Sequence, residues 1–305
     1  MMLEEKGQEY SPYVDVSEAG VSAVMGILRT VFNIARLTIQ ETQRRRLLRM
    51  GSLMAVLFLL VFGVGFHLIY LDLISQSMLP SESSYPFLFL TLAGLYSTNF
   101  LVIMVSILIS VASISGEVES HTIDSLITKP IRRWEIVLGK WLGFAAIILV
   151  YVLLLPGGIL LIVYLRAGLT LNNVPVGLAL IYLEGLVGLS ISLLGGTRLS
   201  TLANGALAFM LYGIAFVGGW VETIGALLRN ETAVDLGIIA SLVMPSEILW
   251  KKASAVFEPR LVTGFEFAGP FSVSSQPSTE MIVYAILYAV VLLLLALWSF
   301  SRRDL

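Results

Sequence analysis

The chain has 305 residues, of which 57% are hydrophobic and 13% are charged, and its formal net charge is -2. Soluble domains carry about 25% charged residues, so this composition excludes an ordinary soluble protein, and the near-neutral charge gives no reason to expect a nucleic-acid partner. The absence of cysteine excludes disulfide bonds and thiolate chemistry, and two histidines are too few for most metal sites, so we expect no metal and no cofactor in this chain.

Residues 1–20 are acidic and polar, and no basic region leads into an apolar core, so we predict a disordered tail rather than a cleavable signal. Residues 21–49 place apolar side chains at helical spacing and polar side chains, including Arg29 and Arg36, on the other side. This pattern predicts an amphipathic helix that lies in the membrane interface with its basic face toward lipid headgroups. An ordinary juxtamembrane anchor is the alternative. The apolar stripe comprises Val24, Ile27, Leu28, Val31, Ile34, Ala35 and Ile39.

Six later stretches are each apolar enough to cross a membrane, for which a helix needs about 20 residues. They cover residues 50–71, 87–114, 141–165, 174–194, 202–224 and 281–300. The pattern indicates an all-α polytopic membrane protein in which residues 50–305 form one six-helix transmembrane domain.

The lysines and arginines predict how this domain is oriented, because they accumulate in cytoplasmic loops. Six spans place both termini on one side, together with the loops that follow spans two and four. Of the 19 lysine and arginine residues, the opposite side holds only Arg166, Arg229, Lys251, Lys252 and Arg260. We therefore expect both termini to be cytoplasmic, in the cell membrane.

The segment between spans two and three, "SGEVESHTIDSLITKPIRRWEIVLGKWLG" (115–143), is the most polar stretch in the middle of the chain. Its acids Glu117 and Glu119 suit the first turn of a helix, and Ile123, Leu126 and Ile127 form one apolar stripe. Residues 116–130 are therefore predicted to form a short helix at the cytosolic surface that docks into a groove of a soluble partner. A charged inside loop with no such role is the alternative.

The end of this segment explains how the chain re-enters the membrane. Pro130 stops one helix and can start the next. Arg132 and Arg133 then suit the cytosolic headgroups, and Lys140 can extend back to the same surface.

The stretch between spans five and six (228–279) lies on the outer face in this topology. It is apolar but interrupted at Pro245, which suits the first position of a new helix. We predict two short helices that dip into the outer leaflet or lie on it, either as a cap on the bundle or as a gate.

Glu184 is the most informative single residue, because it lies near the middle of span four. A charge at that depth costs at least about 2.5–3.5 kcal/mol, so the side chain should face protein or water. It could contact a substrate, a cation or a proton, or it could be a protonated carboxyl group that hydrogen-bonds a neighbouring helix. His67 and Glu222, near the outer ends of their spans, more simply cap packing at the interface.

Several motifs, taken in order, resemble the permeases of type-two ABC transporters. The segment after span two matches by acidic residues, a "T-x-x-x-L-I-x-x-P" core and "R-W-E-x-x-x-G-K". A basic lead-in (44–46), "P-S-E-x-L-W-K-x-A" (245–253) and the ending "F-S-R-R-D-L" (300–305) also match, whereas Ser120 and His121 stand where the family often has lysine and glycine. The matching residues of the segment are Glu117, Glu119, Thr122, Leu126, Ile127, Pro130, Arg133, Trp134, Glu135, Gly139 and Lys140.

The resemblance implies an exporter in which two membrane subunits, here expected to be two copies of this chain, pair with two cytosolic ATPases. It implies that the segment after span two acts as a coupling helix, with Glu117, Glu119, Thr122, Ile123, Leu126, Ile127, Pro130, Arg132 and Arg133 facing the ATPase. The sequence has no "G-x-x-x-x-G-K-[ST]" loop, so ATP and magnesium are expected in the partner chain and no catalysis in this one.

Other classes of protein predict different features. A stand-alone ion-coupled carrier would have inverted repeats and several acids at mid-membrane depth, whereas Glu184 is the only acid well inside a predicted span. An intramembrane protease would have paired catalytic groups, and none is present. A passive scaffold or immunity-type protein would have no use for a coupling helix. A lipid, an amphipathic drug or peptide, a small cation and a glycan all stay open as substrates.

Overall fold

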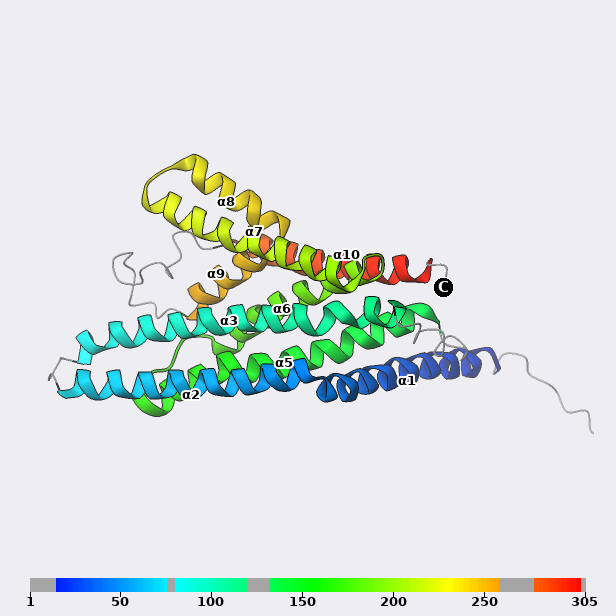
Figure 1. The fold of residues 1–305 in the computed structure, drawn as a ribbon, viewed down its shortest axis with the longest axis horizontal. Helices are drawn as coiled ribbons and strands as arrows, with labels where there is room; N and C mark the ends of the chain where they lie inside the picture. Colours follow the sequence, from blue (N-terminus) through cyan, green and yellow to red (C-terminus); the bar gives the residue numbers. More distant parts are fainter. Residues whose placement is uncertain (1–14, 76–79, 120–131, 258–276, 303–305) are drawn as a thin grey trace, which may run out of the picture.

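The computed structural model describes residues 15–75, 80–119, 132–257 and 277–302, and within these ranges all regular structure is helical. Figure 1 shows the helices as an elongated bundle. They are α1 (Asp15–Arg44), α2 (Arg46–Ser75), α3 (Pro80–Glu119), α5 (Arg133–Ala167), α6 (Val174–Gly196), α7 (Thr201–Leu227), α8 (Glu231–Val243), α9 (Ser246–Phe257) and α10 (Thr279–Ser301).

Six of these helices are long and apolar enough to cross a membrane, namely α2, α3, α5, α6, α7 and α10. Each contains one of the six predicted stretches and extends beyond it, so the predicted all-α class and the six spans are confirmed. The paired helices α8 and α9 meet at a bend of 106° and together form either a broken span or a re-entrant loop.

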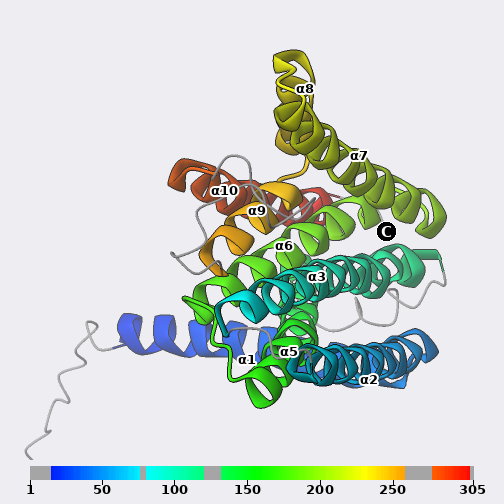
Figure 2. The same cartoon turned by 90° about the vertical axis from the view of Figure 1, so that its left-hand side faces the viewer.

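Helix α6 lies at the centre of the bundle (Figure 2), packed against α3, α5, α7, α9 and α10. Its apolar residues surround the whole helix, which is the pattern of a helix enclosed by other helices. Most of α6 and α3 is buried, whereas α2 and α10 leave most of their surface exposed. The centre of the bundle is therefore where polar side chains are shielded from both lipid and water.

Helix α1 packs closely against α5 through a Gly-x-x-x-Gly motif. A Cβ atom at Gly139 would lie 2.6 Å from Cβ of Ile34, and one at Gly143 would lie 2.8 Å from the carbonyl oxygen of Ala35. Small residues allow such close contact between helix backbones. The face buried here contains Val31, Ala35, Thr38 and Thr42, while Leu28 of the predicted stripe is exposed.

The bounds of α1 also differ from the prediction. The helix begins at Asp15, so the end of the predicted tail is helical, and it stops at Arg44. Residues 46–49, predicted as part of the interfacial helix, belong instead to α2. Residues 1–14 lie outside the described part of the chain.

The predicted break at Pro245 is present, because α9 begins at Ser246 and the carbonyl oxygen of Pro245 accepts its first hydrogen bond, from the Leu249 N–H at 3.3 Å. The predicted helices that dip into the outer leaflet are compatible with the re-entrant loop that α8 and α9 can form, but the alternative, in which both lie on the surface, does not describe α9. Most of its residues are buried, because it packs mainly against α6 and also contacts α3, α7 and α10. Figures 1 and 2 show α8 on the outside of α7, and α9 between this pair and α6.

Candidate functional site

Glu184 lies inside the bundle rather than against lipid. Its side chain on α6 is 2% exposed, and it interacts with the side-chain amide of Asn99 on α3. Asn99 is also buried. The central helix and α3 are thus joined by a polar contact deep in an apolar environment.

A second carboxyl group reaches the same region from α9. Glu247 is buried and close enough to Glu184 to act on it electrostatically. Its side chain lies against α7 where Gly219 has no side chain, because a Cβ atom there would be 2.7 Å from Oε2 of Glu247. Tyr96 of α3 and Tyr212 of α7 are within electrostatic range of both carboxyl groups. Helices α3, α6, α7 and α9 therefore meet around two glutamates.

The next turn of α9 carries a cation. Nζ of Lys251 lies 2.7 Å from Oε2 of Glu222 on α7, and both side chains are about nine-tenths buried. This ion pair also lies within electrostatic range of Glu247. We call Asn99, Glu184, Glu222, Glu247 and Lys251 the buried polar cluster. It contains three carboxyl groups and one lysine.

Aromatic side chains pack along one side of the buried polar cluster. The ring of Tyr96 lies 5.2 Å from that of Trp250 on α9 and 6.3 Å from that of Trp220 on α7, centroid to centroid. The indole N–H of Trp220 donates to the hydroxyl of Tyr96 at 2.8 Å. These contacts keep the cluster in a dry, low-dielectric environment, where charges interact strongly.

Three atoms of the buried polar cluster have no hydrogen bond in the structure: Oε2 of Glu184, Oδ1 of Asn99 and Nζ of Lys251. Nζ of Lys251 is a donor that is compensated by its ion pair with Glu222. The other two atoms are acceptors, and they belong to side chains that interact with each other. Within the described residues, no group of three or more histidine, aspartate or glutamate side chains is placed to hold a metal ion.

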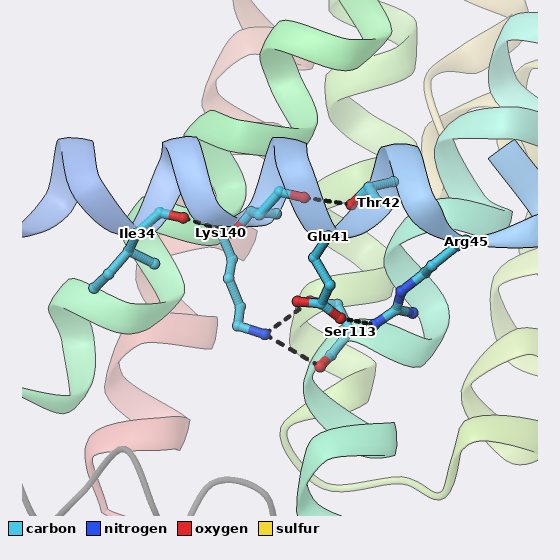
Figure 3. Close-up of polar contacts among 7 residues, drawn as sticks. Ile34, Glu41, Thr42, Arg45, Ser113 and Lys140 are labelled. Carbon is cyan, nitrogen blue, oxygen red and sulfur yellow. Dashed lines mark hydrogen bonds and ion pairs between the residues drawn. The ribbon is translucent and has the colours of Figure 1, made fainter.

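The second candidate region lies where α3 ends and α5 begins, on either side of the predicted coupling segment. Lys140 of α5 is buried, and its Nζ lies 3.3 Å from the carbonyl oxygen and 3.4 Å from the hydroxyl of Ser113 on α3 (Figure 3). Its ammonium group therefore joins the two helices that flank the segment. That Lys140 also extends back to the membrane surface stays a prediction.

Further hydrogen bonds connect the same end of the bundle to α6 and α7. The hydroxyl of Thr201, at the start of α7, donates to that of Ser115 on α3 at 3.1 Å. The side-chain amide of Asn204 on α7 donates to the carbonyl oxygens of Val111 on α3, at 3.2 Å, and of Ser192 on α6, at 2.8 Å. These bonds bring α3, α6 and α7 together at this end.

Helix α10 joins this arrangement through Ser299. Its hydroxyl lies 2.9 Å from that of Thr197, and it accepts a hydrogen bond from Nε of Arg198, also at 2.9 Å. Thr197 and Arg198 form the turn after α6. We call Ser113, Ser115, Lys140, Thr197, Arg198, Thr201, Asn204 and Ser299 the segment-end network.

The structure describes only part of the predicted coupling residues. Glu117 and Glu119 belong to the last turn of α3 rather than to a separate helix. Arg132 is exposed at the N-cap of α5, and Arg133 is its half-buried first residue. Thr122, Ile123, Leu126, Ile127 and Pro130 lie outside the described residues.

Sequence reasoning found Glu184 but missed Asn99, Glu247 and Lys251 as its neighbours. The one available signal was the spacing of Glu247 and Lys251, which places both on one side of a helix. Amphipathic helices with such charges normally face water, so the sequence favoured a surface position. Glu222, predicted to cap packing, is instead one half of the buried ion pair.

Comparison with known proteins gave one family. The model described as "ABC-2 family transporter protein" matches residues 32–305. No curated protein matches the chain. The matched range includes the buried polar cluster, the segment-end network and all six candidate spans.

Proposed function

The chain belongs to the ABC-2 family of transporter proteins, and from this premise we propose that it is the permease subunit of an exporter driven by a separate cytosolic ATPase. The segment after α3 is the proposed coupling element. Two copies of this chain and two ATPases make up the proposed transporter, with both termini cytoplasmic and with ATP and magnesium bound by the ATPase. In the bundle, Glu184 is the proposed contact for a substrate or an ion.

The observation that carries this proposal is how the ends of the coupling segment are fixed. The segment leaves from α3 and returns through α5, and Lys140 joins these helices at Ser113. Asn204 then links α3 to α6 and α7. A force applied to the segment by a soluble partner would therefore act on buried hydrogen bonds between several spans rather than on one helix alone.

Burial increases the effect of these contacts. Ser113, Ser115 and Asn204 are each no more than 1% exposed. A buried hydrogen bond that breaks leaves unpaired polar groups, at a cost of about 1–3 kcal/mol each. The helices at this end are thus expected to move together, as coupling between the segment and the transmembrane domain requires.

The experiment is a gentle affinity purification of the chain from its own host, with identification of the proteins that accompany it. Leu126→Asp places a charge in the apolar stripe of the segment. We expect an ATPase to accompany the wild-type chain and to be lost with this variant.

Leu202→Asp is the matched control, because Leu202 is 85% exposed in the first turn of α7, next to the other short loop on the same predicted side. This variant should keep the ATPase. Purification of the wild-type chain without any ATPase, from cells that express candidate ATPases, would contradict the proposal. Equal loss in both variants would show that the segment has no special part in binding.

The stand-alone carrier is the second candidate, and the buried polar cluster is what favours it, since it adds Glu247 to the one acid seen in the predicted spans. The carrier would take its energy from an ion gradient, whereas the permease would take it from ATP hydrolysis by a partner ATPase. Transport by the purified chain in vesicles with an ion gradient and without ATPase would support the carrier, and dependence on an added ATPase and ATP would support the permease.

A further inference from the structure

Two unpartnered acceptors suggest what the buried polar cluster binds. Oε2 of Glu184 and Oδ1 of Asn99 have no hydrogen-bond donor in the structure. The amide of Asn99 lies close enough to the carboxyl group of Glu184 to interact with it. Two acceptors on adjoining side chains need a donor between them.

A single proton supplies that donor. A protonated carboxyl group has one O–H donor, and a primary amide has both N–H donors and a carbonyl acceptor. A proton on Oε2 of Glu184 could therefore be donated to Oδ1 of Asn99, while the amide N–H donates to the other carboxyl oxygen. The two side chains would then share two complementary hydrogen bonds, and neither oxygen would be left without a partner.

The charge of the cluster also favours a bound cation. Glu184, Glu222 and Glu247 face one lysine, Lys251, and that lysine is paired with Glu222. If all the glutamates were ionised, two negative charges would be buried without compensation, which is very unfavourable in a low-dielectric interior. The described residues offer no group of three ligands for a metal ion, and a proton needs none.

The groups that face Glu184 come from four helices. Asn99 and Tyr96 lie on α3, Tyr212 on α7 and Glu247 on α9. Helices α5 and α10 also pack on α6, but no described charge from either is among those that act on Glu184. Glu247 is thus the nearby group whose charge controls how firmly Glu184 holds a proton. Lys251 and Glu222 act in turn on Glu247.

We infer that Glu184 and Asn99 form a proton-binding site in the core of the subunit, occupied at neutral pH, and that Glu247 of α9 controls its occupancy. The site rests on the proposed function and deepens it, because it identifies the proposed ion at Glu184 as a proton. A change in the position of α9 would alter the charge near Glu184 and thereby release or take up a proton.

The experiment is infrared spectroscopy of the purified full chain in lipid nanodiscs, titrated with pH. At neutral pH the wild-type chain should show the carbonyl stretch of protonated carboxyl groups, to which Glu247 also contributes because burial raises its pKa to about 8, and Glu184→Gln should lose the Glu184 component. The control Glu41→Gln, on the exposed pair of α1, should keep it. Glu184→Gln is expected to fold, because glutamine has nearly the same shape and its amide can donate to Asn99.

Two further variants test the roles of the neighbours. In Asn99→Leu the carboxyl O–H loses its acceptor, so the Glu184 band should shift to the higher frequency of a weakly hydrogen-bonded group. In Glu247→Gln a nearby negative charge is removed, which favours ionisation, so the band should be lost at a lower pH than in the wild-type chain.

Three results would overturn the inference. One is an equal carboxyl band in the wild-type chain and in Glu184→Gln, with unchanged helix content. Another is a wild-type band that forms only when sodium and potassium are removed, because the site would then hold a metal cation. The third is an unchanged titration in Glu247→Gln. Each result is obtained without an ATPase, so it would remove the proton from Glu184 but leave the proposed permease role and the proposed ATPase partner untouched.

Discussion

The ion pair between Lys251 and Glu222 gives a prediction that can be worked out from the structure. Its two atoms lie 2.7 Å apart and the side chains are 10% and 9% exposed. Removing one partner of a buried pair leaves an uncompensated charge, at a cost of about 3–5 kcal/mol. We therefore expect Lys251→Met and Glu222→Gln each to lower the free energy of unfolding by about this amount.

The double variant, Lys251→Met with Glu222→Gln, separates the energy of the ion pair from the contributions of the two side chains alone. With both charges gone, nothing is left unpaired, so the double variant should cost much less than the sum of the single variants. The coupling energy should lie near the upper end of the usual range of about 0.5–3 kcal/mol for contacting residues. The measurement is reversible unfolding of the purified chain in mixed detergent micelles, followed by loss of helix signal.

The same chain contains a control ion pair with nearly the same distance between its charged atoms. Arg45 and Glu41 of α1 lie 2.6 Å apart (Figure 3), but their side chains are 32% and 53% exposed. An exposed pair four residues apart on a helix contributes only about 0.3–0.5 kcal/mol. If the cycle on Lys251 and Glu222 gives no more coupling than the one on Arg45 and Glu41, burial does not strengthen the first pair, and our account of α9 fails.

Two other substitutions test the packing of the bundle. Gly143→Leu should separate α1 from α5, because even a Cβ atom would lie 2.8 Å from the Ala35 carbonyl oxygen. Overpacking of this kind lowers the free energy of unfolding by about 1–3 kcal/mol. The control is Gly26→Leu, where a Cβ atom would have nothing within 4 Å, and it should have little effect on the midpoint of unfolding. Asn204→Leu should cost about 1–3 kcal/mol for each carbonyl oxygen left without its donor, whereas Asn33→Leu on the exposed side of α1 should be neutral in the same assay.

The six spans could be predicted because length and apolar composition are local properties of the sequence. The predicted apolar stripe also contains much of the buried side of α1, including Val31 and Ala35. That this side packs on α5 could not be predicted, because lipid and protein are both apolar and a hydrophobic stripe suits either. What determines this contact is size, since Gly139 and Gly143 bring α5 so close that small or branched side chains such as Ala35 and Thr38 fit, while Leu28 stays outside. That information lies on α5, far from α1 in the sequence.

The buried position of α9 could not be predicted from the sequence for a related reason. Its polar residues, Glu247 and Lys251, favour a surface when the helix is considered alone. The structure compensates Lys251 with Glu222, and it places Glu247 against Gly219. Burial of these charges therefore depends on partners in another helix, which hydropathy within a short window does not detect.

Helix α6 is the element that contacts both polar regions. It carries Glu184 of the buried polar cluster, and one of its carbonyl oxygens, that of Ser192, accepts from Asn204 in the segment-end network. Eight residues separate these positions, which is about 12 Å along an α-helix. Between them Ser190 accepts a hydrogen bond from the indole of Trp141 on α5 at 3.1 Å, so α6 is bonded to a helix that flanks the proposed coupling segment. If α6 moves with α5 as a rigid unit, Glu184 moves relative to Asn99 and Glu247, which lie on other helices. The proposed proton site would then respond to the proposed coupling segment through one helix.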